Sequence, residues 1–240
     1  MDLNGKVAVV TGGSKGIGFS IAQALARAGA SVVISGRDAA ALAYAQSRLA
    51  DEVGADRVTA VEADMRAYDA VDGLMTAAVT TYGGLDILIN NAGLGIFRNV
   101  ADMTLDEWQT VIDTNLTGVF YGCHAAIPHL RNRGGGWIVN VSSLAGKNSF
   151  VGAAAYCASK AGLNAFSESL MQEVRYDNIR VSYIMPGSVR TGFGGHAEDA
   201  GGDWKLDPDD IAEVVVDLIR HPSRSLPSRV EIRPAKPPRK

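Results

Sequence analysis

The stretch Lys6–Gly18, KVAVVTGGSKGIG, joins a strand-length apolar run to a glycine-rich turn and then to the start of a helix. The run KVAVVT has the nearly continuous apolar character of a strand that is buried on both faces. Gly12, Gly16 and Gly18 follow, and apolar residues then recur at helical spacing as far as Ala28. Backbone N–H groups of such a turn, at a helix N-terminus, favour a bound anion. The stretch therefore predicts a phosphate-binding turn between a strand and a helix.

Strands and helices continue to alternate along the rest of the chain. Besides Lys6–Thr11, the predicted strands are Ser31–Ser35, Arg57–Ala63, Leu85–Asn90, Trp137–Val141, Ile179–Met185 and Arg229–Ile232. The predicted helices are Gly16–Ala28, Asp38–Val53, Ala67–Tyr82, Thr104–Leu130, Ala154–Arg175 and Asp207–Arg220. The longest of them is expected to bend or end near Pro128. This alternation requires right-handed crossovers, so we expect one α/β domain over residues 1–240, a doubly wound parallel sheet of about seven strands with helices on both faces (a Rossmann fold).

Composition places the chain among ordinary globular proteins and excludes several kinds of partner. Hydrophobic residues make up 47% of the 240 residues, charged residues 20%, and the formal net charge is -3. This charge favours neither nucleic acid nor an anionic membrane. We see neither a signal peptide nor an apolar run of about 18 residues that would span a membrane, so a cytoplasmic location is expected. The cysteines and histidines lack metal-ligand spacing, and no metal is expected.

Ligands of doubly wound folds bind beyond the carboxyl ends of the strands, so chemistry is expected in the residues that follow each strand. Segment 192–203 comes after the sixth strand and is rich in Gly, Asp and Ala. We expect it to be the substrate loop, with few apolar residues to line a pocket. The tail 233–240 is rich in Pro and Lys and is expected to be loose.

The turn T-G-x-x-x-G-x-G, formed by Thr11–Gly18, resembles that of the short-chain dehydrogenases/reductases. Further matching motifs follow later strands, namely Asn90–Gly93 (N-N-A-G), Ser142-Ser143, Tyr156 with Lys160 (Tyr-x-x-x-Lys) and Pro186-Gly187. The resemblance covers roughly residues 6–191. It implies an oxidoreductase that transfers a hydride between a nicotinamide cofactor and a carbonyl or secondary alcohol.

Tyr156 and Lys160 are the expected centre of catalysis. Residues four apart lie on one face of a helix, so the phenol and the ammonium can share a pocket. A nearby cation is expected to lower the pKa of the tyrosine from about 10, which suits a general acid and base. By its spacing from Tyr156, Ser143 is implied to hold the substrate oxygen, with Ser142 structural. The resemblance also implies that Asn115 holds a water, which relays protons through Lys160 and the cofactor ribose to Tyr156.

The end of the second predicted strand distinguishes between the two nicotinamide cofactors. An NAD site usually carries Asp or Glu there to bind the ribose 2′-hydroxyl, whereas this strand ends Ser35-Gly36-Arg37. Arg37 can bind a 2′-phosphate through two hydrogen bonds, and Lys15 can add a second positive charge. Asp38 is expected to cap the next helix. The expected cofactor is therefore NADP(H).

The resemblance implies further contacts with this cofactor. Asp64 and Met65 are implied to contact the adenine, although Asp64 is equally suited to capping the next helix. Val189 and Thr191 are implied to hold the nicotinamide carboxamide. The expected cofactor-binding residues are Gly12, Ser14, Lys15, Gly16, Ile17, Gly18, Arg37, Asp64, Met65, Asn91, Ala92, Gly93, Tyr156, Lys160, Pro186, Gly187, Val189 and Thr191.

The sequence leaves the substrate open. Reductases of 3-oxoacyl groups on acyl-carrier protein resemble this chain, but they usually carry a basic residue where it has Asp177-Asn178 and a Gly-Gly segment where it has Val230–Pro234. That reductase, an NAD-dependent alcohol dehydrogenase and a non-catalytic NADP(H)-sensing protein stay as alternatives. Family members pair their long helices, so we expect a homodimer or homotetramer through small residues such as Ala125, Ala126, Ala161 and Ala165.

Overall fold

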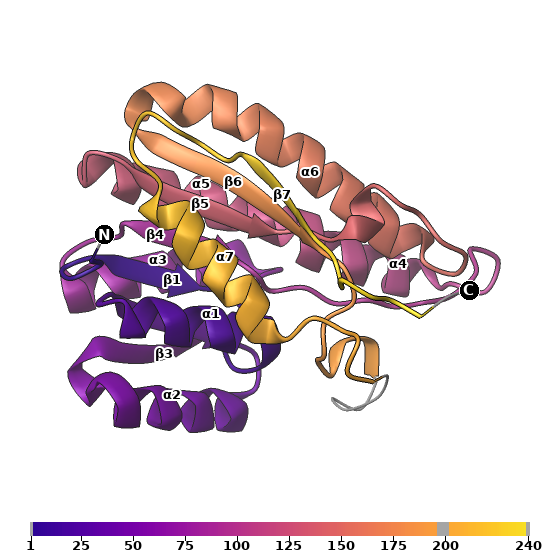
Figure 1. Ribbon diagram of the computed structural model, residues 1–240, viewed down its shortest axis with the longest axis horizontal. Helices are drawn as coiled ribbons and strands as arrows, with labels where there is room; N and C mark the ends of the chain where they lie inside the picture. Colours follow the sequence, from indigo (N-terminus) through magenta and orange to yellow (C-terminus); the bar gives the residue numbers. More distant parts are fainter. Residues whose placement is uncertain (1, 196–201, 239–240) are drawn as a thin grey trace.

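The computed structural model describes residues 2–195 and 202–238. Within these residues, seven strands form one sheet in the order β3-β2-β1-β4-β5-β6-β7 (Figure 1). Their bounds are β1 Val7–Val10, β2 Ser31–Gly36, β3 Val58–Glu62, β4 Ile87–Asn90, β5 Gly136–Val141, β6 Ile179–Pro186 and β7 Arg229–Ile232. All neighbouring strands pair in parallel. The predicted doubly wound sheet is therefore confirmed.

Helices cover both faces of the sheet. One face carries α1 (Gly16–Arg27), α2 (Ala39–Val53) and α7 (Pro208–Arg220), and α1 and α7 lie side by side across it (Figure 1). The other face carries α3 (Tyr68–Tyr82), α5 (Gly118–Asn132) and α6 (Ala154–Val174). Because side chains alternate along a strand, Ala8 and Val10 join the first core while Val7 and Val9 join the second.

The order in which strands are added to the sheet reverses at β1. β2 and β3 are added on one side of β1, and β4 to β7 are added on its other side. The loops after β1 and β4 therefore diverge and leave a crevice at the carboxyl edge of the sheet, where doubly wound folds bind their ligands.

The long predicted helix over 104–130 differs most from the structure. It consists of α4 (Leu105–Ile112), a π-helical turn over Asp113–Thr117, and α5. Pro128 lies inside α5, which continues to Asn132, so the helix does not end at Pro128 itself. The irregularity lies earlier, at the π turn, where one extra residue is accommodated in the helix.

Local signals at two helix starts are confirmed. The Asp38 side chain accepts hydrogen bonds from the N–H groups of Ala40 and Ala41 at the start of α2. Asp207 forms a capping box with Asp210, and Pro208 takes the first position of α7. Residues 196–201 of the expected substrate loop and 239–240 of the expected tail lie outside the described residues. In the described ranges, each helix is too short or too polar to cross a membrane.

Candidate active site

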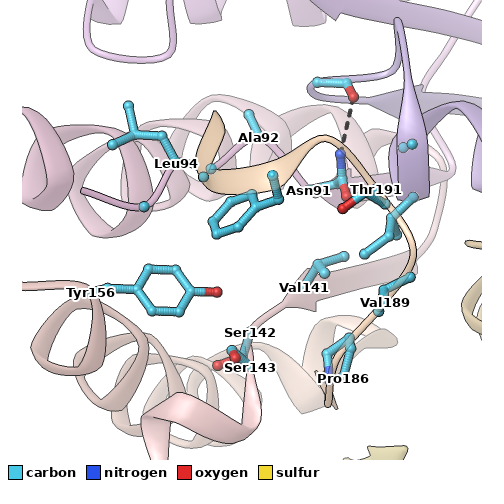
Figure 2. Close-up of a pocket in the computed structure, with 18 of the residues that line it drawn as sticks. Asn91, Ala92, Leu94, Val141, Ser142, Ser143, Tyr156, Pro186, Val189 and Thr191 are labelled. Atoms are coloured by element: carbon cyan, nitrogen blue, oxygen red, sulfur yellow. Dashed lines mark hydrogen bonds between the residues drawn. The ribbon is translucent and has the colours of Figure 1, made fainter. Parts of the chain in front are cut away.

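A cavity of about 1140 Å³ opens at the carboxyl edge of the sheet. It is lined by residues that follow β1 through β6 and by the start of α6. Figure 2 shows the Tyr156 hydroxyl pointing into it, with Ser143, Pro186 and Val189 around the same space. Each residue of the expected cofactor-binding set lines this cavity, and so does Ser143. The cavity is larger than most sites for one small molecule, which gives room for a dinucleotide and a second ligand.

The glycine turn after β1 brings bare backbone to the cavity wall. Gly12 and Gly16 have φ of 63° and 54°, in the left-handed region that favours glycine. A Cβ on Gly18 would lie 2.2 Å from the Gly12 carbonyl oxygen, so no larger residue fits there. The Asn91 side-chain amide, which follows the neighbouring strand β4, donates to the carbonyl oxygens of Thr11 and Gly12 at 3.0 and 3.1 Å and so holds the turn in place.

Positive charge gathers where β2 ends. Lys15 and Arg37 are exposed and both line the cavity. Asp38, next to Arg37, is the N-cap of α2, and its carboxylate accepts hydrogen bonds from backbone N–H groups of that helix. The cavity therefore carries two cations at this end and an acid that is already hydrogen-bonded to backbone.

Asp64 follows β3 and is held by its near neighbour. The Arg66 guanidinium approaches its carboxylate to 2.6 Å, and the Arg66 N–H also donates to it. These hydrogen bonds lower the pKa of Asp64 below its ordinary value. Asp64 does not cap α3, because the N-cap of that helix is Ala67 and it receives no side-chain hydrogen bond. The side chain instead stays at the cavity wall beside Met65.

The two serines after β5 face different surroundings. Ser142 is buried, and its hydroxyl donates to the Asn164 side chain at 2.5 Å, which ties β5 to α6. Ser143 faces the cavity, and its Oγ accepts a hydrogen bond from the Ala145 N–H at 3.1 Å. Because Ser143 faces the cavity beside Tyr156 whereas Ser142 is buried, Ser143 is the serine that can donate to a ligand.

Tyr156 and Lys160 lie one turn apart near the start of α6, and both are buried. Burial raises the pKa of Tyr156 above its ordinary value, and the Ser143 hydroxyl partly offsets the rise. Burial lowers the pKa of Lys160 to about 8. The expectation that Lys160 lowers the pKa of Tyr156 is therefore wrong for the protein by itself. The Lys160 Nζ atom donates to the Val141 carbonyl oxygen at 2.9 Å and lies 6.0 Å from the centre of the Tyr156 ring.

Asn115 is the one expected site residue that does not line the cavity. It lies in the π turn with no exposed surface. Its amide donates to the Leu94 carbonyl oxygen at 2.8 Å and to Ser159 Oγ at 3.0 Å, while its oxygen accepts from the Leu94 N–H at 2.9 Å. The side chain thus braces the loop after β4 against α6, behind the Tyr156–Lys160 pair.

The segment after β6 closes the other side of the cavity. The Gly187 N–H donates to the Ile232 carbonyl oxygen at 2.8 Å, which holds this segment to the end of β7. Thr191 packs on the glycine turn, since a Cβ on Gly16 would lie 3.2 Å from its methyl group. Val189 and Thr191 are thereby held at the cavity wall.

The sequence reasoning missed a group of aromatic residues at the cavity. Phe97 follows β4, Phe150 follows β5, and Phe193 follows β6, and all three line the cavity near Tyr156. Phe193 belongs to the loop that was expected to contribute little apolar surface. The residues share no spacing and no motif. The one available signal was that each follows a strand at the carboxyl edge.

Comparisons with known proteins agree on one family. A family model described as short chain dehydrogenase matches residues 6–200. An uncharacterized oxidoreductase of Staphylococcus saprophyticus is 36% identical over 234 residues, which are 98% of this chain and 99% of that protein. An alcohol dehydrogenase from the archaeon Thermococcus sibiricus, solved with 5-hydroxy-NADP, is 28% identical with a TM-score of 0.89, covering 98% of this chain and 99% of its own. A metagenomic short-chain oxidoreductase solved with NADP is 35% identical with a TM-score of 0.85, covering 97% and 99%.

Proposed function

The chain belongs to the short-chain dehydrogenase/reductase family and is an oxidoreductase of that family, and on this basis we propose that it transfers a hydride between NADP(H) and a carbonyl or secondary alcohol, with Tyr156 as general acid and base. One observation carries the proposal. The Tyr156 phenol, the Ser143 hydroxyl and the Lys160 ammonium line a single cavity at the carboxyl edge of the sheet. A carbonyl oxygen placed among them would meet two hydroxyl donors and a nearby proton source.

The residues of the cavity fit a dinucleotide. The Gly12–Gly18 turn offers backbone rather than side chains to a pyrophosphate, at the N-terminus of α1. Gly93 leaves room in front of Lys160, because a Cβ there would lie 3.6 Å from the ammonium nitrogen. Val189 and Thr191 are held at the opposite end. These residues would bind the cofactor along the crevice.

NADP(H) suits the cavity better than NAD(H). Arg37 and Lys15 are both exposed at the cavity, where they can bind a 2′-phosphate. Asp38, the acid nearest to them in the sequence, already accepts two backbone hydrogen bonds through its Oδ1 atom. The two similar solved structures were obtained with NADP or a derivative of it, which points the same way.

The proposed mechanism assigns a proton or a hydrogen bond to each residue. When bound, NADP(H) supplies or accepts the hydride. In reduction, Ser143 and Tyr156 donate hydrogen bonds to the carbonyl oxygen, and Tyr156 then gives its proton to that oxygen. The raised pKa of Tyr156 keeps the phenol protonated and ready to donate. Lys160, with a pKa of about 8, is largely protonated near neutral pH and can replace that proton. Asn115, buried behind the pair, holds the β4 loop and α6 in register.

The proposal is tested by the loss of NADPH absorbance with ketones, aldehydes and 3-oxoacyl thioesters. Turnover on this panel is expected, with NADH clearly poorer. Tyr156→Phe should lower kcat by about 10²–10⁴-fold while it leaves NADPH binding intact. Arg37→Ala should weaken NADPH binding about tenfold and NADH binding little.

The alternatives give different results in the same experiment. A preference for 3-oxoacyl thioesters identifies the acyl-carrier-protein reductase activity, and tighter binding of NADH identifies an NAD-dependent enzyme. Binding of NADPH with no turnover on any substrate class contradicts the proposal and favours a sensor. A Tyr156→Phe variant within about tenfold of wild type contradicts the assigned role of Tyr156.

A further inference from the structure

Phenylalanine side chains that line the cavity pack against the Tyr156 ring. We call Phe97, Phe150 and Phe193 the aromatic wall. The Phe97 ring centre lies 5.7 Å from that of Tyr156 in an edge-on arrangement, and the Phe193 ring centre lies 5.5 Å from it. Phe150 extends the wall, with its ring centre 6.0 Å from that of Phe97. The wall thus begins in contact with the residue that donates the proton.

The backbone is shaped to let two of these rings approach. Gly95 lies in the loop after β4, and a Cβ there would stand 2.8 Å from the Phe97 ring and 2.9 Å from the Phe193 ring. Both distances are too short for any other residue unless the rings moved apart. Gly95 therefore allows rings from two different loops to meet beside Tyr156.

The wall has apolar surface to offer a ligand. Phe97, Phe150 and Phe193 are 40%, 54% and 38% exposed, although they line the cavity. The loops that carry the rings add the apolar residues Leu94, Leu144 and Ala145 to the cavity lining, together with the uncharged polar residues Asn148 and Thr191. Lys15 and Arg37 follow β1 and β2, whereas Lys205 and Arg233, which also line the cavity, come after β6 and β7, and Arg233 is paired with Glu231. The three rings therefore offer apolar contacts to a ligand that lies beside Tyr156.

From this geometry we propose that the substrate is an uncharged ketone or secondary alcohol with an aryl-sized apolar group, and that Phe97 and Phe193 determine this preference. The inference rests on the function proposed above and adds the chemical class of the substrate. The reacting oxygen would lie at Tyr156 and Ser143, and the apolar group would lie against the wall. Edge-on and offset contacts between rings favour an aromatic group there beyond the area that it buries.

The test compares 4-phenyl-2-butanone with 2-butanone. The two ketones share the reacting carbonyl, and two methylene groups separate it from the phenyl ring, so their intrinsic reactivities are close. The measured quantity is the ratio of their kcat/KM values with NADPH. Wild type is expected to favour the phenyl ketone at least tenfold, through KM. Phe97→Ala and Phe193→Ala should each lower the ratio about three- to tenfold, the effect of one lost ring contact. Tyr44→Ala, which removes an exposed ring on α2 outside the cavity, should leave it unchanged.

Binding to Tyr156→Phe separates this inference from the proposed function. The variant keeps the ring and loses the hydroxyl, and ketone binding is read from the quenching of bound NADPH fluorescence. If Tyr156→Phe binds the phenyl ketone more tightly than 2-butanone but wild type turns over neither ketone, the role of the aromatic wall is supported and the proposed function is contradicted. Turnover of both ketones at similar kcat/KM, or a ratio that stays within twofold in both Phe variants, overturns the inference and leaves the proposed function standing. Equal binding of both ketones also overturns it.

Discussion

Lys160 is an ionisable residue that lies buried in the protein. The residue is only 4% exposed, and its ammonium donates a hydrogen bond to the Val141 carbonyl oxygen. Removing an ammonium from water disfavours its charged form, which is why its pKa falls to about 8. The same position beside Tyr156 makes the lysine useful as a proton source. Burying the Lys160 ammonium therefore lowers the stability of the folded protein, at a residue that the proposed chemistry requires.

This cost predicts a pH-dependent stability. Lysine has a pKa of 10.5 in the unfolded chain and about 8 at this site, so between these values the unfolded chain binds more protons. The free energy of unfolding therefore rises with pH through this window, and the full penalty is present below it. The free energy of unfolding of Lys160→Met, taken relative to that of wild type, should therefore be higher at about pH 7 than at about pH 10 by roughly 2 kcal/mol.

Urea denaturation of wild type and variant at the two pH values measures this difference. Lys147→Met is the control, because the Lys147 side chain is 54% exposed. Its effect on the free energy of unfolding should differ little between the two pH values. A Lys160→Met effect that is the same at both pH values would show that Lys160 keeps an ordinary pKa.

At the scale of elements, buried amides set α6 against the sheet. Asn90 at the end of β4 donates to the Asn140 side chain on β5, and Asn140 donates to Ser167 on α6, both at 2.9 Å. Ser167 in turn donates to the Leu163 carbonyl oxygen. Since α6 also carries Tyr156 and Lys160, the proposed catalytic pair, this series of hydrogen bonds helps to fix the position of the pair relative to the strand ends.

Asn140→Ala should break this series at its centre. The variant removes the oxygen that accepts from the Asn90 amide and the N–H that donates to Ser167, so the free energy of unfolding should fall by about 1–3 kcal/mol. Chemical denaturation measures it, with Ser169→Ala on the exposed side of α6 as a control that should change by less than about 0.5 kcal/mol. A loss of similar size in both variants would refute a special role for the amide series.

At the scale of the whole molecule, an aromatic group on α5 and α6 stands apart from the cavity. Phe120 is 47% exposed, and its ring lies 5.9 Å from Tyr121 and 6.4 Å from Phe166. Clustered exposed apolar side chains are a common feature of protein–protein contact surfaces. The small residues expected to pair the helices divide into two sets. Ala161 and Ala165 are exposed, whereas Ala125 and Ala126 are buried in the protomer core and are unavailable for pairing.

The expected homo-oligomer can be tested on this surface. Phe120→Glu would place a charge in the contact, so it should lower the molar mass measured by light scattering relative to wild type. Tyr44→Glu, at an exposed ring on α2, should leave the mass unchanged. A wild-type protein with the mass of one chain would refute the oligomer, and an unaltered mass in Phe120→Glu would exclude this surface.

Patterns over short stretches of sequence determined the fold and the order of the motifs. Alternating apolar runs and helical periodicities predicted the parallel sheet, because the spacing of apolar residues within each element shows which of its faces is buried. The glycine turn and the Tyr156–Lys160 pair could be predicted as well, since their geometry depends on a few neighbouring residues. The cap of α2 by Asp38 belongs to the same class.

Tertiary structure alone decided the properties that depend on residues distant in sequence. The raised pKa of Tyr156 reflects burial by several segments, and the position of Asn115 behind the cavity reflects a π turn packed on α6. The aromatic wall is assembled by three separate loops, with Gly95 making room for two of the rings. Local patterns report what an element buries, whereas a pocket is made by side chains that converge from many elements, and only the packed chain brings them together.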